Sequence, residues 1–268
     1  MAEEPASETP RPQTVIGVVH PRAVDAGRGA SWFSEGWRLF TPAVGPWILI
    51  VIVGFFLHLV LAFIPVLGSI ASQLIFPVLM AGLMLGCRAI DRGEPLTVAH
   101  LFAGFGPRVG PLLIVALIYL AAAVAIVIFV VALLFVFFGA AVLSQLWSSQ
   151  DSMSTAAAMG GLALIGLVGV LVFLLLFLPV VMAVWFAPAL IVLNGLEPWE
   201  SMKLSFFGCL RNILPFLVYG VVWIGLAIVA TIPLFLGWLV LGPVTVASIY
   251  ASYCDIFEQP VGVSAARV

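Results

Sequence analysis

Charge is what this sequence has least of. Only 8% of its 268 residues are Asp, Glu, Lys or Arg, against about 25% in a water-soluble domain. Hydrophobic residues make up 64% of the chain, and its mean hydropathy is +1.27. Because so few charges cannot cover a water-facing surface, we predict an integral membrane protein. The same scarcity leaves no basic face, which excludes nucleic acid as a partner.

Catalytic and cofactor motifs are also absent from the sequence. It contains no phosphate-binding loop, no His-Glu-x-x-His and no Gly-x-Ser-x-Gly. His58 stands alone in its apolar run, and a single histidine without an acidic partner packs more often than it relays protons. We therefore predict no enzyme activity and no cofactor. A metal site formed by Cys87, Cys209, Cys254 and His100 is a minor alternative, because no Cys-x-x-Cys spacing supports it.

Long uncharged runs mark the membrane crossings. A helix needs about 20 apolar residues to cross a hydrocarbon core of about 30 Å. Six runs qualify, and Pro and Gly predict turns near residues 64–68 and 232–237. The predicted spans are 47–64, 69–87, 111–143, 156–193, 213–231 and 238–254. The fold class is therefore all-α, a polytopic membrane protein with six transmembrane helices.

The cations predict the orientation of these helices. All ten Lys and Arg residues fall in segments 1–46, 88–110, 194–212 and the C-terminal tail, which lie on one side of the membrane in a six-helix topology. Since such residues stay in the cytoplasm, we expect both termini there, in a bacterial inner membrane. We expect residues 1–30 to form a flexible cytoplasmic leader, not a signal peptide, and 259–268 a tail.

A threefold repeat predicts how the spans are paired. Pro77-Val78-Leu79-Met80-Ala81 recurs at residues 179–183 and more loosely at 243–247. Gly-Glu-Pro follows the first copy and Gly-x-Glu-Pro the second, and Arg108 and Arg211 come fourteen residues after the respective Glu. Amphipathic stretches precede each pair of spans, for example around Trp32. We predict three hairpins in a domain over 31–258, each behind an interfacial helix, with units 31–92, 93–195 and 196–258.

The middle hairpin is too long for the bilayer. Residues 111–146 carry no charge, which is about 54 Å of helix against about 30 Å of hydrocarbon. We expect the surplus to extend on the outer side as a polar cap and a contact surface for a partner. The cap residues are Ser144, Gln145, Trp147, Ser148, Gln150 and Asp151.

Two sets of residues are candidates for function and for packing. Arg88, Arg92, Arg108 and Arg211 lie at the depth of lipid phosphates and can bind anionic headgroups or a partner; the alternative is a solvated, ion-paired rim. For helix packing we single out the Gly-x-x-x-Gly pair of Gly82 and Gly86 and the span prolines Pro77, Pro179 and Pro243.

Several of these motifs carry a family resemblance. They are Trp32-x4-Trp37-Arg38-Leu39-Phe40, residues 64–68, Phe76-Pro77, Gly93-Glu94-Pro95 and residues 101–105. Over about residues 30–258 the chain resembles a family of uncharacterised six-helix proteins of bacterial inner membranes. More distantly it is similar to the membrane domain beside some glycerophosphodiester phosphodiesterases. The resemblance implies a helical plasma-membrane protein and brings no established activity.

Three functions remain open at this point. The first is a non-enzymatic scaffold or accessory subunit that binds membrane lipids, a membrane-protein partner or a second copy of itself. The second is a transporter or pore for a neutral or apolar solute, suggested by the repeat and the span prolines. The third is a lipid-modifying enzyme that uses rim residues such as Arg88, Asp91 and Glu94.

Overall fold

The computed structural model describes residues 19–147 and 154–258, which are helical and contain no strand. Pro42 lies in a short 3-10 turn, η1 (Thr41–Ala43), and a second turn, η2 (Ala103–Phe105), follows α4. The helices are α1 (Arg28–Phe40), α2 (Val44–Ala62), α3 (Leu67–Asp91), α4 (Ala99–Phe102), α5 (Val109–Trp147), α6 (Ser154–Trp185), α7 (Ala187–Asn194), α8 (Pro198–Arg211), α9 (Ile213–Thr231) and α10 (Trp238–Phe257).

Six helical segments of the described chain are long and apolar enough to cross a membrane. They lie over the six predicted spans, and α9 has the predicted bounds, so the all-α, six-helix prediction is confirmed. One span differs from its prediction. The run 156–193 is not one helix, because α6 ends at Trp185 and α7 begins at Ala187.

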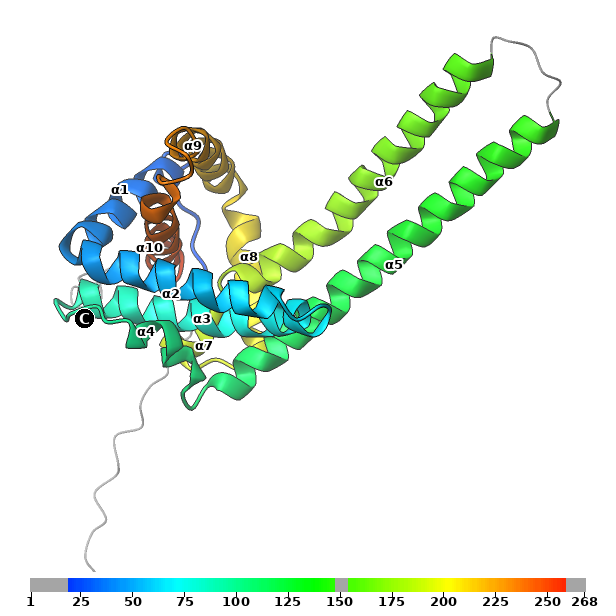
Figure 1. The fold of residues 1–268 in the computed structure, drawn as a ribbon. Coiled ribbons are helices and arrows are strands. Elements are labelled where there is room, and N and C mark those ends of the chain that lie inside the picture. Colours follow the sequence, from blue (N-terminus) through cyan, green and yellow to red (C-terminus); the bar gives the residue numbers. More distant parts are fainter. Residues whose placement is uncertain (1–18, 148–153, 259–268) are drawn as a thin grey trace, which may run out of the picture.

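The helices form a body and an arm (Figure 1). The body contains α1 to α4 and α7 to α10, while α5 and α6 run side by side away from it, obliquely to α2 and α3. With 39 residues, α5 is about 58 Å long, well beyond one bilayer core. It continues to Trp147, and the rest of the expected outer cap, residues 148–153, lies outside the described part of the chain.

The helix α1 packs its aromatic face on protein. Trp32, Phe33 and Phe40 are buried, and the Phe33 ring stacks on Tyr219 of α9 at 4.5 Å between ring centroids. A Cβ atom at Gly36 would lie 2.7 Å from the Val244 carbonyl oxygen of α10. The glycine therefore lets α1 and α10 approach closely. The face that the sequence assigned to the lipid interface meets α9 and α10, with Trp37 left exposed.

Part of the expected leader has a defined structure. The Arg22 backbone N–H donates to the Ile256 carbonyl at 3.0 Å. The Val24 N–H donates to Asn212 Oδ1 at 2.8 Å, and Asn212 Nδ2 donates to the Arg22 carbonyl at 2.9 Å. Residues 19–27 thus form a strap across α10 and the α8–α9 junction, which corrects the expectation of a flexible leader up to residue 30. Residues 1–18 and 259–268 lie outside the described chain.

The sequence repeat coincides with a structural one at the helix ends. Gly93 and Gly195 have φ angles of +78° and +70° and follow α3 and α7 respectively. This left-handed conformation favours glycine and ends a helix. The second expected interfacial helix is short, since α4 has four residues before the turn η2. The arrangement as three hairpins with interfacial helices stays a prediction.

Gly82 and Gly86, the predicted packing glycines, lie where α3 packs against residues 96–104, the segment that contains α4. A Cβ atom at Gly82 would lie 2.3 Å from the His100 carbonyl oxygen, and one at Gly86 would lie 2.7 Å from the Leu96 side chain. Gly104, which the sequence analysis did not assign to packing, completes the contact, because its Cβ would meet the Val78 carbonyl at 1.9 Å. The Gly-x-x-x-Gly pair therefore faces a segment of the same chain.

Candidate functional site: an apolar cavity and a charged rim

A break between α6 and α7 shapes the centre of the body. Pro188 has no N–H, so it leaves the Val184 carbonyl without its helical partner. Two residues earlier, the hydroxyl of Ser205 on α8 bridges a backbone pair: it accepts from the Phe186 N–H at 2.9 Å and donates to the Met182 carbonyl at 2.7 Å. This serine satisfies backbone groups that the break exposes, which makes the bend stable.

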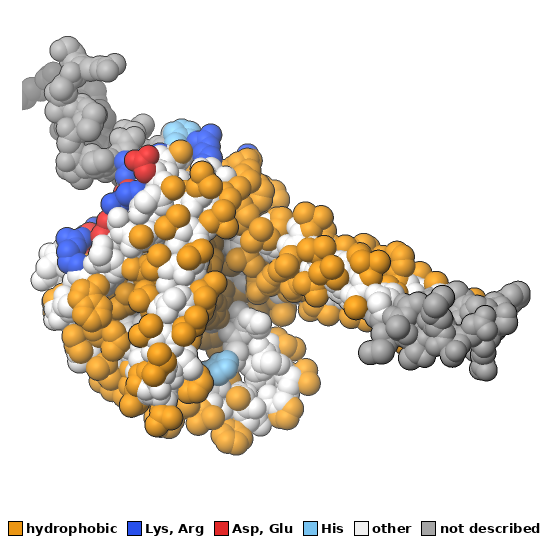
Figure 2. Space-filling view, turned by 90° about the horizontal axis from the view of Figure 1, so that it is seen from above, with side chains coloured by type: hydrophobic (Ala, Val, Ile, Leu, Met, Phe, Trp, Pro, Cys, Tyr) orange, Lys and Arg blue, Asp and Glu red, His pale blue; other side chains and the backbone are white. Residues whose placement is uncertain are grey.

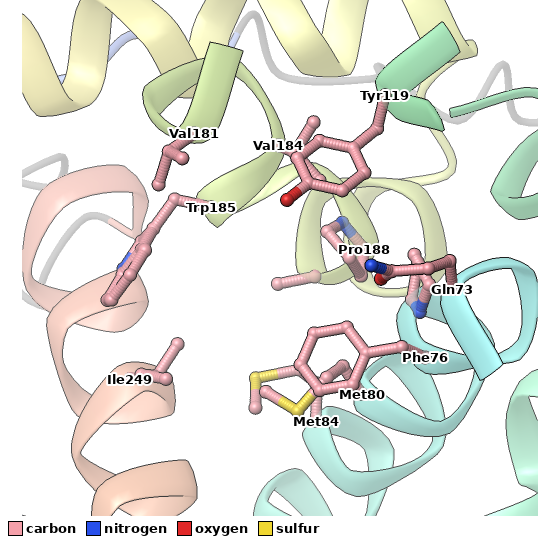
Figure 3. A pocket seen from close by; sticks show the side chains of 12 residues that line it. Gln73, Phe76, Met80, Met84, Tyr119, Val181, Val184, Trp185, Pro188 and Ile249 are labelled. Atoms are coloured by element: carbon pink, nitrogen blue, oxygen red, sulfur yellow. The ribbon is translucent and has the colours of Figure 1, made fainter. Parts of the chain in front are cut away.

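A cavity of about 310 Å³ lies beside this break. Five helices line it, namely α3, α5, α6, α7 and α10. Figure 3 shows Tyr119, Val181 and Val184 on one side of the space and Phe76, Met80, Met84 and Ile249 on the other. We call this space the apolar cavity, because its polar lining groups are few: Gln73, the Tyr119 hydroxyl and the Trp185 indole.

Trp185 has an unsatisfied polar group at this place. Its Nε1 atom is buried and has no hydrogen-bond partner among the described residues. A buried donor without a partner costs free energy, and native structures rarely leave one unexplained. The Trp185 indole N–H is therefore an unsatisfied donor beside the apolar cavity.

Two more spaces adjoin the apolar cavity. An apolar one of about 250 Å³ lies between α2, α3 and α10 and is lined by Trp47, Met80 and Pro243 among others. A larger recess, of about 520 Å³, opens at the turn between α2 and α3. Phe76 lines all three spaces. Phe76, which precedes Pro77, thus lies where the three spaces meet.

The predicted packing prolines divide into two groups. Pro77 lines the apolar cavity, as does Pro188, and Pro243 lines the adjoining apolar space. Pro179, in α6, is exposed on the surface of the arm. His58, which the sequence left without a role, lines the recess together with Gln73. Pro77, Pro188, Pro243 and His58 therefore line adjoining spaces around α3, whereas Pro179 does not.

Charged side chains gather at one end of the body, away from the tip of the arm (Figure 2). This charged rim contains all four predicted arginines. Arg88 pairs with Glu258, and Arg211 donates to the Pro21 carbonyl at 2.8 Å. Arg108 Nη1 lies 3.7 Å from Glu197 Oε1 in an exposed pair, and Arg92 is exposed. Arg88 and Arg211 are therefore held by protein groups, Arg108 forms an exposed ion pair, and Arg92 is exposed.

Another ionic cluster of the rim is centred on Asp255, near the end of α10. Asp255 Oδ2 accepts from Arg28 Nε at 2.6 Å and from Trp32 Nε1 at 3.0 Å. Asp255 Oδ1 accepts from Arg22 Nη2 at 3.0 Å. No local motif signals this cluster, because Asp255 is more than 220 positions from its three partners. Its role is to hold the strap and α1 on the end of α10.

The cysteines do not form a metal site in this part of the chain. Among the described residues, no group of three or more His, Cys, Asp or Glu side chains lies close enough to hold an ion. The His100 ring lies 3.1 Å from the Thr97 hydroxyl instead. Burial raises the pKa of the Cys209 thiol to about 12, and this thiol contacts the Met182 carbonyl at 3.6 Å. Cys209 is therefore a packing residue beside the α6–α7 break.

Comparisons with known proteins agree with the membrane assignment. The chain is 26% identical over 216 residues to a probable inner membrane protein of Burkholderia thailandensis, covering 76% of this chain and 75% of that protein. No protein-family model and no solved structure matches the sequence, and no link to glycerophosphodiester phosphodiesterases emerges. The six apolar helices and this relative together identify the chain as a multi-pass protein of the inner membrane.

Proposed function

We propose that this protein is a non-enzymatic, lipid-binding component of the inner membrane that holds the apolar chain of a lipid in the apolar cavity. The observation that carries the proposal is the cavity itself: about 310 Å³ of space between five helices with no charged side chain in its wall. Ligand sites in proteins begin at about 300 Å³ and are mostly apolar. Because the surrounding solvent is lipid, an acyl chain is the molecule that reaches this space first.

The charged rim supports a second contact with lipid. Arg92 and Arg108 are exposed, and their guanidinium groups suit the phosphates of anionic lipids. Arg88 and Arg211 belong to the same rim, but Glu258 and the Pro21 carbonyl bind them. We expect headgroup contact through the first two arginines and a structural contribution from the other two. This proposal places the rim in the cytoplasm, where anionic lipids and cationic residues meet.

Lipid retention by cavity-filling variants tests the proposed function. Val184 lines the apolar cavity on α6, whereas Leu175 is a 73% exposed residue of the same helix. Purification in mild detergent and native mass spectrometry should show bound lipid on the wild type and on Leu175→Phe, and at least tenfold less on Val184→Phe. A wild-type chain free of lipid, or equal retention by the two variants, would overturn the proposal.

Transport of a neutral or apolar solute is the alternative function. Three adjoining spaces meet at Phe76, and at least one proline lines each of them, as expected of helices that change shape. Flux assays in sealed vesicles separate the two functions. A binding component retains lipid without moving solute, whereas a transporter shows flux that Val184→Phe abolishes.

A further inference from the structure

The recess beside the apolar cavity differs from it in chemistry. His58 of α2 and Ser69, Ser72 and Gln73 of α3 contribute polar groups to its wall. Gln73 and Phe76 line both spaces, so the recess and the cavity adjoin along α3. We call the recess at the α2–α3 turn the polar recess. A polar space joined to an apolar one matches the two parts of an amphiphile.

The polar groups of this recess are available to a ligand. The Ser69 hydroxyl donates to the Val66 carbonyl at 2.7 Å, whereas His58, Ser72 and Gln73 have no side-chain hydrogen bond within residues 19–147 and 154–258. His58 lies four residues before the end of α2, about 6 Å from it, and Gln73 six residues after the start of α3, about 9 Å. His58 and Gln73 are exposed and Ser72 is partly buried, so these polar groups are accessible to a ligand in the recess.

Pro77 adds a backbone acceptor at the same position. A proline has no N–H, so residue 77 cannot donate to the carbonyl of residue 73, four positions earlier in α3. The Gln73 carbonyl thus lacks its usual helical donor where the recess meets the cavity. A ligand hydroxyl placed there finds a carbonyl acceptor beside the amide of the same residue.

The length of the apolar part fits one lipid chain in one leaflet. Gln73, Phe76, Met80 and Met84 line the cavity on one face of α3. The eleven positions from Gln73 to Met84 correspond to about 16 Å of helix. Half of the hydrocarbon core is about 15 Å. A headgroup in the polar recess therefore leaves its chain in register with the whole apolar cavity.

The linings carry no charged side chain, which limits the headgroup. A phosphate or ammonium group placed there would lack a counter-charge and would be poorly solvated. From this juxtaposition we propose that the polar recess and the apolar cavity form one site for an amphiphile with a small, uncharged, hydrogen-bonding headgroup, such as the hydroxyl of a diacylglycerol. This inference rests on the proposed function and specifies its ligand class.

A paired-probe experiment tests the headgroup. The full chain is reconstituted in nanodiscs containing equal amounts of diacylglycerol and phosphatidic acid with identical acyl chains, then extracted and analysed by native mass spectrometry. We expect at least a tenfold preference for diacylglycerol in the wild type. The double variant His58→Leu/Gln73→Leu should reduce that preference to less than twofold. Ser34→Leu, an exposed position on α1 outside both linings, should preserve it.

The outcomes separate the ligand class from the proposed function. If the wild type retains both probes equally and Val184→Phe loses both, chain binding stands and the headgroup inference is overturned. If the wild type retains neither probe, both fall. Ile249→Phe fills the cavity from α10 and repeats the Val184→Phe measurement should that variant fail to fold, as judged by gel filtration.

Discussion

Arg28 and Asp255 join the first helix of the described chain to the last, with Arg28 Nε 2.6 Å from Asp255 Oδ2. The same carboxylate oxygen also accepts from the indole of Trp32, which is fully buried. One acidic side chain at the end of α10 therefore positions both the charge and the aromatic face of α1. This ion pair therefore joins the two ends of the body, α1 and α10.

Asp255→Asn should destabilise the protein. The change removes the negative charge that faces Arg28 and Arg22, and Asp255 is only 13% exposed. Loss of a charged hydrogen-bond partner costs about 1–3 kcal/mol. Thermal unfolding in detergent should show a lower melting temperature than the wild type. Glu200→Gln, which removes an exposed carboxylate of α8, is the control and should melt with the wild type. Equal melting of both variants would contradict the role of Asp255.

The spans were predictable because their signal is local. Residues 213–231 contain no charge for 19 positions, and the bilayer permits only a helix there, so the predicted bounds and those of α9 agree. The break at Phe186 was missed, since Pro188 alone does not tell whether a helix bends or ends. The decisive partner is Ser205, which comes from another helix.

The contacts of the site and of α1 were not predictable in the same way. The periodicity of Trp32, Phe33 and Phe40 indicates a buried face, but it does not distinguish lipid from the surface of α10. The close approach of Gly36 to Val244 depends on tertiary structure. The cavity likewise results from how five helices pack. Pro77 and His58 were recognised singly, and their common location around Gln73 came from the fold.

Gly82→Ala should destabilise the contact between α3 and the segment that contains α4. The added Cβ would lie 2.3 Å from the backbone oxygen of His100, which cannot move without shifting the segment. Overpacking of this kind costs about 1–3 kcal/mol. Gly220→Ala on α9 is the matched control, because no atom lies within 4 Å of its Cβ. That change should leave stability unchanged or raise it by about 0.5–1 kcal/mol. The order of the two melting temperatures decides the prediction.

Cys209 should react slowly with maleimide. Burial raises the pKa of its thiol from 9.0 to about 12, so below pH 9 the reactive thiolate fraction is about a thousandfold smaller than for an ordinary cysteine. Labelling between pH 7 and 9 should rise with pH and remain far below that of a cysteine introduced at exposed Ser34. The measurement uses Cys87→Ala/Cys254→Ala protein as background. Comparable labelling rates at the two positions would show that the thiol is accessible.

The rim arginines should separate into two functional groups. Arg92→Gln/Arg108→Gln removes exposed charges and should weaken binding to vesicles of anionic lipid while leaving the melting temperature unchanged. Arg88→Gln leaves Glu258 without its ionic partner and should lower the melting temperature instead. Each readout therefore serves as the control for the other variant. If Arg88→Gln alone weakened lipid binding, the assignment of the two groups would be reversed.

The orientation of the chain is the last prediction, and it determines which leaflet each site faces. All ten cations lie in segments assigned to one side, so the charged rim should be cytoplasmic and the turn between α9 and α10 periplasmic. Alkaline phosphatase fused after Gly237 should be active in intact cells, because the enzyme needs the oxidising periplasm. A fusion after Arg211, at the end of α8, should be inactive. The opposite pattern would place the rim in the periplasm and the polar recess in the inner leaflet, which changes the supply of lipid to the cavity.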